Sequence, residues 1–261
     1  MVRVLCIGDV VGESGIQCLK KRLPAVKKEY GADLTVVNGE NAGKYNCLAP
    51  ENVHMLYEAG ADVITTGNHV FRNPGLRNVL ESDGCLLRPA NWGRSGIPGT
   101  GVCVFDRGRY RVAVVNIIGV TYMNPAENPF YTLEDILREL DTPMVVVDFH
   151  AEATGEKRAM GFAFDGKISA LFGTHTHVQT ADEQILPGGT GYITDAGMTG
   201  TVDSVLGVKK EIIIPWMRDH LPARFTLEEG PGALHGVCFT LEEKTGQCIG
   251  TDRISLPAER A

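Results

Sequence analysis

Short runs of apolar and often β-branched residues recur along the chain and predict strands. Many of these runs are continuously apolar instead of alternating with polar residues, which is typical of strands that are covered on both faces of a sheet. The predicted strands span residues 2–7, 34–38, 62–66, 85–89, 111–118, 143–150, 168–173 and 191–194.

Amphipathic segments lie between the early strands. Apolar residues recur every three or four positions in segments 16–26, 53–57 and 76–80, so each segment is predicted to be a helix with one buried face. Alternating strands and helices predict right-handed crossovers and a largely parallel sheet in the N-terminal part. After residue 100 the strands follow one another more closely, with turn sequences at 106–109 and 186–191, and predict a second, mixed sheet.

Two further helices and a hairpin complete the pattern. Residues 133–140 and 208–221 have helical spacing, and the second of these helices is expected to bend or end at Pro215. The last part of the chain is predicted to be a β-hairpin with its turn near residues 244–246. The sequence contains no internal repeat and no long linker, so we predict a single α/β domain over residues 1–261, with two stacked sheets and outer helices.

Composition and charge exclude several classes of protein. The chain has 261 residues, of which 43% are hydrophobic, enough to form a buried core. Its net charge is -7 and it has no run of Lys or Arg, which argues against sequence-independent binding to a polyanion. The longest apolar stretches, such as residues 112–120, are far shorter than the ~20 residues that cross a bilayer.

The N-terminus and the cysteines indicate the compartment. The first apolar run contains Arg3 and ends at Asp9, unlike an export signal. The seven cysteines are an odd number and form no C-x-x-C pair, as is typical of free thiols in a reducing environment. We therefore predict a cytoplasmic protein.

Five polar clusters each follow a predicted strand: GDVVG at 8–12, GENAG at 39–43, GNHVF at 67–71, DFHAE at 148–152 and GTHTH at 173–177. Open α/β sheets bind ligands at the carboxyl ends of their strands. Each cluster alone is a weak signal, since an Asp can cap a helix and a lone His is often structural. Together they favour a metal centre built from Asp9, Glu40, Asn41, Asn68, His69, His150, His175 and His177.

The donor types indicate which ions such a centre would bind. His175 and His177 point to the same side if their segment is extended, because side chains alternate along a strand. Imidazole, carboxylate and amide donors without a thiolate favour Mn, Fe or Zn and argue against a structural zinc site. Eight candidates are more than one ion uses, so we predict two ions bridged by a carboxylate, roughly 3.5 to 4 Å apart.

The charge of this centre indicates its substrate. Two divalent cations carry about +4, while Asp9, Glu40 and a bridging hydroxide carry about -3, which leaves roughly one positive charge. Such a centre attracts an anion, and phosphate oxygens can replace water on both ions. Metal binding also lowers the pKa of the bridging water toward neutrality, which supplies a nucleophile for attack on phosphorus. The predicted chemistry is therefore phosphoryl transfer.

The five polar clusters, in the order in which they follow one another along the chain, resemble the motifs of the calcineurin-like metallophosphoesterases. The strings RPANW at 88–92, DFHAEATGEK at 148–157, GTHTHVQTAD at 173–182 and ITDAGMTG at 193–200 are similar to those of the YmdB-like branch in particular. The similarity extends from Val2 to about Ile254. It implies a four-layer α/β/β/α sandwich of two mixed sheets, the metallophosphoesterase fold.

The resemblance also implies roles for the clustered residues. Asp9, Asn41 and His177 would hold one ion, and Asn68, His150 and His175 the other. Glu40 would bridge the two ions, and His69 would be the general acid that protonates the departing alkoxide. The sequence departs from the wider superfamily at Val11, where a histidine ligand is usual, and at Glu40, where Asp is usual. Asn41 is interpreted as the replacement for the missing histidine.

The activity implied by the resemblance is hydrolysis of 2′,3′-cyclic nucleotides such as 2′,3′-cyclic AMP, with iron or manganese as the ions and zinc as an alternative. A diester monoanion suits a site of modest positive charge, and a ribose alkoxide needs an acid such as His69. Two alternatives stay open: a phosphomonoesterase or nuclease on the same site, with RNA as substrate despite the lack of a basic patch, and a nucleotide- or RNA-sensing regulatory protein with little turnover. A homo-oligomer also stays open.

Other polar residues near the motifs are predicted to support the site. Candidates that could orient a ligand imidazole, or cap a helix or turn, are Asp148, Asp182 and Asp195. Candidates that could line the substrate pocket are Arg72, Asn91 and Thr199. The histidines that lack neighbouring motif residues are interpreted as surface or packing residues: His54, His220 and His235.

Overall fold

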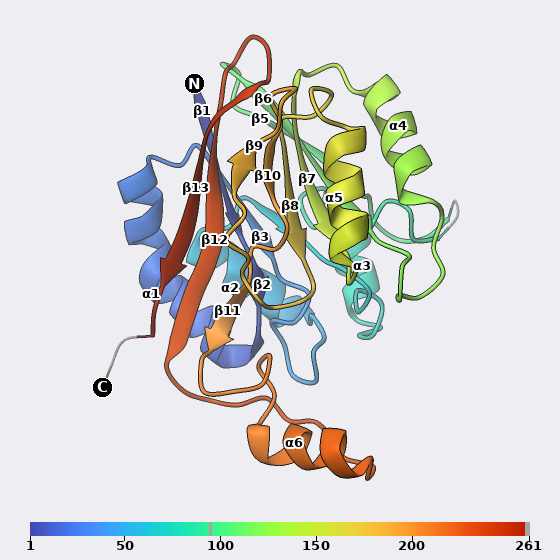
Figure 1. Ribbon diagram of the computed structural model, residues 1–261, viewed down its shortest axis with the longest axis vertical. Helices are drawn as coiled ribbons and strands as arrows, with labels where there is room; N and C mark the ends of the chain where they lie inside the picture. Colours follow the sequence, from blue (N-terminus) through green and yellow to red (C-terminus); the bar gives the residue numbers. More distant parts are fainter. Residues whose placement is uncertain (94–95, 259–261) are drawn as a thin grey trace.

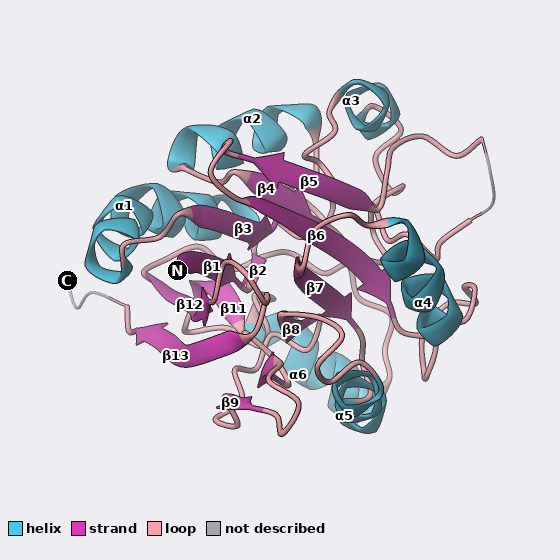
Figure 2. Cartoon of the chain, turned by 90° about the horizontal axis from the view of Figure 1, so that it is seen from above, coloured by secondary structure: helices cyan, strands magenta, loops and turns pink. Residues whose placement is uncertain are grey.

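The computed structural model describes residues 1–93 and 96–258, which form two mixed β-sheets packed face to face (Figures 1 and 2). The first sheet contains β1 (Val2–Ile7), β2 (Asp9–Val10), β3 (Leu34–Asn38), β4 (Val63–Thr65), β11 (Met198–Thr201), β12 (Gly232–Leu241) and β13 (Cys248–Leu256). Their order is β2-β11-β12-β1-β3-β4, and β13 pairs with β12. The neighbours β1, β3 and β4 are parallel, as predicted for the N-terminal part.

The second sheet is built from the middle of the chain. It contains β5 (Val102–Asp106), β6 (Arg111–Ile118), β7 (Met144–His150), β8 (Ala170–Thr174), β9 (Gln184–Ile185) and β10 (Gly191–Ile193). Their order is β5-β6-β7-β8-β10-β9, with parallel pairing from β6 through β10. The carboxyl ends of β7 and β8 therefore lie side by side.

Helices cover the outer faces of both sheets (Figure 2). Those on the first sheet are α1 (Gly12–Tyr30), α2 (Pro50–Ala59) and α3 (Leu76–Ser82). Those on the second are α4 (Pro129–Glu139) and α5 (Thr154–Ala163). A further helix, α6 (Lys210–Asp219), projects beyond the sandwich at the bottom of Figure 1. Among the described helices, none combines the length and the apolar character needed to span a membrane.

Three separate apolar cores hold the layers together. Leu5 of β1 packs against α1 to α3, whereas its neighbour Val4 packs between the two sheets. Likewise, Val114 of β6 faces the space between the sheets and Val115 packs against α4 and α5. Neighbouring strand residues point to opposite faces, so strands covered on both sides must be apolar at every position. This arrangement confirms the predicted four-layer sandwich.

Some local predictions need correction. The predicted strand at 85–89 is reduced to two isolated bridges, one through Leu86 and one through Leu87. Helix α5 was not predicted, because its sequence TGEKRAMGFA contains two glycines and only a weak apolar stripe. Helix α6 does not end at Pro215 but continues to Asp219. The predicted C-terminal hairpin is confirmed, and it pairs with β1 and so extends the first sheet.

Candidate metal centre

Residues from both sheets meet where the parallel strands end. Three of the predicted donors surround the imidazole of His150, which is the last residue of β7, and a fourth contacts one of these three. Its Nε2 lies 3.1 Å from Asn68 Oδ1, 3.1 Å from His175 Nδ1 and 3.3 Å from Glu40 Oε1. The fourth, His69, has its Nδ1 3.1 Å from the same Glu40 oxygen. Loops that follow β3, β4, β7 and β8 thus converge on one point.

The other predicted donors form an adjacent group. His177 Nε2 lies 3.1 Å from Asn41 Nδ2 and 3.6 Å from Asp9 Oδ1. The Oδ2 atom of Asp9 accepts a hydrogen bond of 3.0 Å from the backbone N–H of His175, which joins the two groups. The structure therefore brings all eight predicted residues together, in the grouping that the family resemblance implies.

Glu40 is the buried centre of this cluster. It is 1% exposed, and neither carboxylate oxygen receives a hydrogen bond from any described residue. The imidazoles of His69 and His150 contact Oε1 without hydrogen-bond geometry. A buried carboxylate without hydrogen bonds is costly unless a cation balances it. The unsatisfied oxygens therefore fit a metal ligand.

Gly67 keeps space free beside this carboxylate. A Cβ atom at this position would lie 2.1 Å from Glu40 Oε2 and 2.3 Å from His150 Nε2. Any side chain here would therefore displace the two central groups. The glycine allows the β4 loop to approach them closely.

The spacing of the donors also fits shared ions. Two atoms bound to one ion at about 2.1 Å lie roughly 3.0 to 3.4 Å apart, and the contacts around His150 fall in this range. Within the described ranges, no three His, Cys, Asp or Glu side chains are arranged so that they could hold an ion by themselves. A metal site in either group would therefore need an asparagine as well, Asn41 or Asn68.

Asn41 can act as a ligand only if its amide turns. In the structure its Nδ2 faces His177, and its Oδ1 lies 3.0 Å from His69 Nδ1. The two ends of an amide have nearly the same shape, so a half rotation would present the oxygen to the Asp9 and His177 group.

The carboxylates and histidines of the cluster shift one another's pKa values. Burial opposes the charge on Asp9, but His177 and His150 hold the pKa of this carboxyl well below its ordinary value. Burial likewise opposes the charge on Glu40, and His150 still keeps its pKa low. For His150, burial favours the neutral ring, but Glu40 outweighs it and raises the pKa to about 9. A cation that binds here must displace this proton.

A buried relay orients the His150 ring. Its Nδ1 lies 2.9 Å from Thr174 Oγ1, and the Thr174 hydroxyl donates a hydrogen bond of 2.6 Å to Asp148. Asp148 also accepts hydrogen bonds from Asn38 and Thr65. The relay leaves Nε2 directed at Glu40. The predicted supporting role of Asp148 is thus exerted through Thr174, which the sequence did not single out.

Replacing Thr174 with valine is expected to weaken metal binding about 10- to 100-fold, because partners that fix a ligand imidazole typically contribute this much. Titration of metal-free protein with Mn²⁺ measures the change. Thr190→Val is the matched control, because Thr190 is also buried and its hydroxyl bonds to backbone atoms outside the cluster. Equal weakening in both variants would contradict the relay.

The segment with the last two histidines is a bend. His175 and His177 have φ angles of 99° and 65°, so the segment is not extended and the condition for strand-like alternation is not met, although both rings still reach the cluster. Such angles persist only where the surroundings impose them. Here Asp195 accepts hydrogen bonds from the backbone N–H and hydroxyl of Thr176.

A buried cation completes this support. Lys157 Nζ lies 2.7 Å from Asp195 Oδ2 and 2.8 Å from the carbonyl oxygen of Thr174, and Lys157 is fully buried. Asp195 therefore holds the backbone of the bend and not an imidazole. Lys157 is not among the residues predicted from the sequence. The only sequence feature that points to it is its place at the end of the string DFHAEATGEK.

The other predicted support residues have structural roles. Asp182 accepts hydrogen bonds from Thr180 and Thr194. The Asn91 side-chain amide donates hydrogen bonds to the backbone carbonyl oxygens of Ile118 and Glu127. Thr199 is buried in β11, and Arg72 lines a cavity of about 210 Å³ beside Tyr45. The three histidines outside the motifs lie apart from the cluster: His54 on α2, His220 just after α6 and His235 on β12.

A cavity of about 310 Å³ opens above the cluster. Its polar side contains Asn41, His69, Glu152, His175 and His177. This volume is at the lower end of the range for small-molecule sites, roughly 300 to 1,000 Å³. It suits a ligand of about mononucleotide size.

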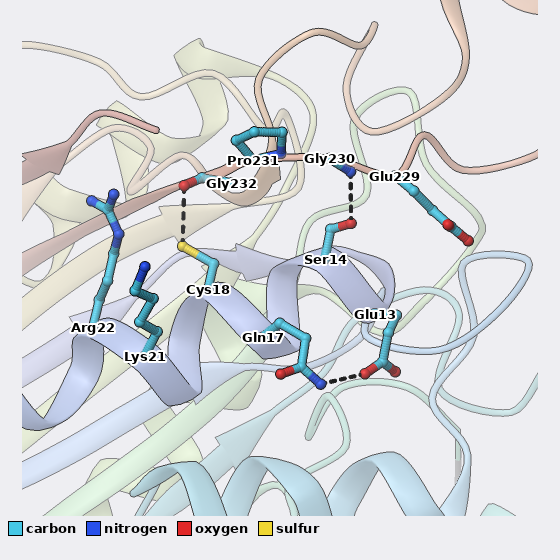
Figure 3. A pocket seen from close by; sticks show the side chains of 10 residues that line it. All are labelled: Glu13, Ser14, Gln17, Cys18, Lys21, Arg22, Glu229, Gly230, Pro231 and Gly232. Atoms are coloured by element: carbon cyan, nitrogen blue, oxygen red, sulfur yellow. Dashed lines mark hydrogen bonds between the residues drawn. The ribbon is translucent and has the colours of Figure 1, made fainter. Parts of the chain in front are cut away.

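A larger cavity of about 590 Å³ lies between α1 and residues 229–232 (Figure 3). Ser14 and Cys18 of α1 hydrogen-bond to the backbones of Gly230 and Gly232 there. None of the predicted site residues is among the described residues that line it. Size alone therefore does not mark the functional site.

Comparison with known proteins decides the family. A sequence model described as "YmdB-like protein" matches residues 5–254. The chain belongs to the YmdB-like family. This YmdB-like chain is 42% identical over 255 residues, 97% of its own length and 96% of the relative's, to a Bacillus subtilis (strain 168) protein named 2′,3′-cyclic-nucleotide 2′-phosphodiesterase. The predicted family is therefore confirmed.

Solved structures support the same assignment. A phosphatase from Mycoplasma pneumoniae superposes on the YmdB-like chain with a TM-score of 0.92 and 35% identity, over 98% of this chain and 93% of that one. A Staphylococcus aureus structure described as a 5′-nucleotidase shares the fold, with a TM-score of 0.62 and 16% identity, over 99% of this chain and 55% of that one. The metallophosphoesterase fold is confirmed, and a family with this fold implies divalent metal ions.

Proposed function

We propose that this YmdB-like protein is a metal-dependent phosphodiesterase that opens 2′,3′-cyclic nucleotides such as 2′,3′-cyclic AMP. The predicted enzyme class is confirmed by the likeness to the Bacillus subtilis hydrolase. The observation that carries the proposal is the buried Glu40 carboxylate, which lacks hydrogen bonds from the described residues and lies among histidines beneath a cavity of mononucleotide size. The name of the relative supports the cyclic substrate.

The proposed ligand sets follow the two groups in the structure. Asp9, Asn41 and His177 would hold one divalent ion, and Asn68, His150 and His175 would hold the second, with Glu40 shared between them. Iron and manganese suit this mixture of nitrogen and oxygen donors, and zinc is the alternative. When bound, the ions supply Lewis acidity toward the phosphate and acidify a water so that it can attack phosphorus.

His69 is proposed to protonate the leaving alkoxide. Its Nδ1 contacts Glu40 and Asn41, which leaves Nε2 as the nitrogen that can reach a substrate. Burial lowers the pKa of His69 to about 4 in the protein without ions or substrate, so the ring there is neutral at pH 7. A phosphodiester anion in the cavity favours the protonated ring by Coulomb attraction. This attraction raises the pKa of His69, which is the direction that a general acid requires.

The compartment is also a proposal. All seven cysteines are free thiols, including Cys85 and Cys103, whose sulfur atoms lie 3.3 Å apart. Free thiols are typical of proteins in a reducing compartment. This supports the cytoplasm.

Turnover measurements test the proposed function. With Mn²⁺ or Fe²⁺, the protein is expected to hydrolyse 2′,3′-cyclic AMP, and a chelator should abolish the activity until the metal is restored. p-Nitrophenyl phosphate and a short RNA in the same assay report on the monoesterase and nuclease alternatives. A metal-loaded protein that cleaves only the monoester or only the RNA would contradict the proposal.

A further inference from the structure

The cavity above the metal cluster has an apolar side opposite its polar one. We propose that this side binds the nucleobase of the substrate, an inference that rests on the proposed phosphodiesterase function. We call it the base wall; it consists of Val205, Leu206, Val208, Ile213, Met217 and Phe225. These residues come from the loop before α6, from α6 and from the segment after it.

The base wall is fixed relative to the metal cluster. His177 Nδ1 lies 3.0 Å from the carbonyl oxygen of Leu206, so a proposed metal ligand and the wall share a hydrogen bond. Val208 forms backbone bridges with Val205 and with Leu227, which hold this loop against the segment after α6. The distance from cluster to wall is therefore set by the fold, as a subsite for one part of a substrate requires.

An aromatic ring is available for stacking on the wall. Trp216 packs edge-on against Phe225, with ring centroids 5.2 Å apart and an interplanar angle of 89°, which fixes the orientation of the Phe225 ring. Phe225 is nevertheless 37% exposed and Met217 56% exposed. Apolar side chains left open beside a polar cluster are typical of a binding site. Every nucleobase has a π-face that can stack on such a ring.

Asn46 supplies a polar atom at the edge of the wall. It lines the same cavity, and its Oδ1 is buried with no hydrogen-bond partner within the described part of the chain. An unpaired buried carbonyl oxygen favours a ligand that donates a hydrogen bond. The exocyclic amine of adenine or cytosine can donate, whereas uracil has a carbonyl at this edge. With the Asn46 oxygen, and not its NH2 group, turned toward the cavity, we expect 2′,3′-cyclic AMP to be preferred over 2′,3′-cyclic UMP, and Asn46→Ala to remove the preference.

The experiment compares two cyclic diesters that differ in the base. Glycerol 1,2-cyclic phosphate has the same five-membered phosphate ring as 2′,3′-cyclic AMP but no base. Phe225→Ala is expected to lower kcat/KM for 2′,3′-cyclic AMP about 10- to 100-fold, mainly through KM, and to leave the glycerol ester nearly unchanged. Leu221→Ala is the control, because Leu221 is exposed just beyond α6 and is not among the described residues that line the cavity. It should affect neither substrate.

The outcomes separate this inference from the proposed function. If the unchanged protein cleaves both diesters with equal kcat/KM, or if Phe225→Ala impairs both equally, the base wall is wrong and the phosphodiesterase function stands. If the unchanged protein cleaves neither, the function fails, and adenosine titrated against the fluorescence of Trp216 in a Trp92→Phe background still tests the wall. A saturable change that Phe225→Ala removes supports it. If adenosine causes no fluorescence change, the base wall does not bind a nucleobase and the inference is wrong. A second copy of the chain that covers the wall would give this result.

Discussion

Replacing Glu40 with glutamine is expected to lower kcat on 2′,3′-cyclic AMP by about 10³-fold or more and to prevent binding of a pair of ions. Glutamine keeps the shape of the side chain but removes the charge that would be shared between the two ions. Elemental analysis and single-substrate kinetics measure the two effects. Glu58→Gln is the control, since Glu58 is an exposed carboxylate of α2 that contacts Lys20 and His54, away from the cluster.

The same substitution should separate metal-dependent from intrinsic stability. A ligand that binds only the folded state stabilises it by about 2.7 kcal/mol at one hundred times its Kd. The unchanged protein should therefore resist urea better with saturating Mn²⁺ than without it, and Glu40→Gln should lose most of this difference. A Glu40→Gln protein that still binds two ions and is still stabilised by Mn²⁺ would show that Glu40 does not bridge them.

The sequence predicts the cluster well because its signal is local. Each donor follows an apolar strand, and parallel strands bring their carboxyl ends to one edge of a sheet. Glu40 after β3 is thus placed beside the residues after β4, and His150 at the end of β7 beside those after β8, while the packing of the two sheets brings the two edges together. The same apolar runs predict the layers, since strands buried on both faces carry no polar alternation.

The supporting contacts could not be predicted because they join residues far apart in the chain. Thr174 links His150 to Asp148, and buried Lys157 stabilises the bend through Asp195. The base wall is anchored by the carbonyl oxygen of Leu206, and a backbone atom leaves no trace in the residue type. The bend itself was missed because His-Thr-His alternates in the same way as a strand.

Replacing His69 with alanine is expected to lower kcat on 2′,3′-cyclic AMP by about 10²- to 10⁴-fold, the usual contribution of a general acid. The metal content should stay the same, because the proposed ligand sets do not include His69. His54→Ala is the control, since His54 is an exposed histidine of α2 that contacts Glu58. Elemental analysis of both variants, beside the kinetics, separates loss of chemistry from loss of ions.

The identity of the leaving group then tests the role of the acid itself. A ribose alkoxide is a poor leaving group and must be protonated as it departs, whereas p-nitrophenolate leaves without a proton. His69→Ala should therefore retain much more activity on bis-p-nitrophenyl phosphate than on 2′,3′-cyclic AMP. If both substrates lose activity equally with the ions in place, His69 binds the phosphate and does not donate a proton. If the ions are lost as well, His69 is a ligand, and its contact with Glu40 at 3.1 Å reflects a shared ion.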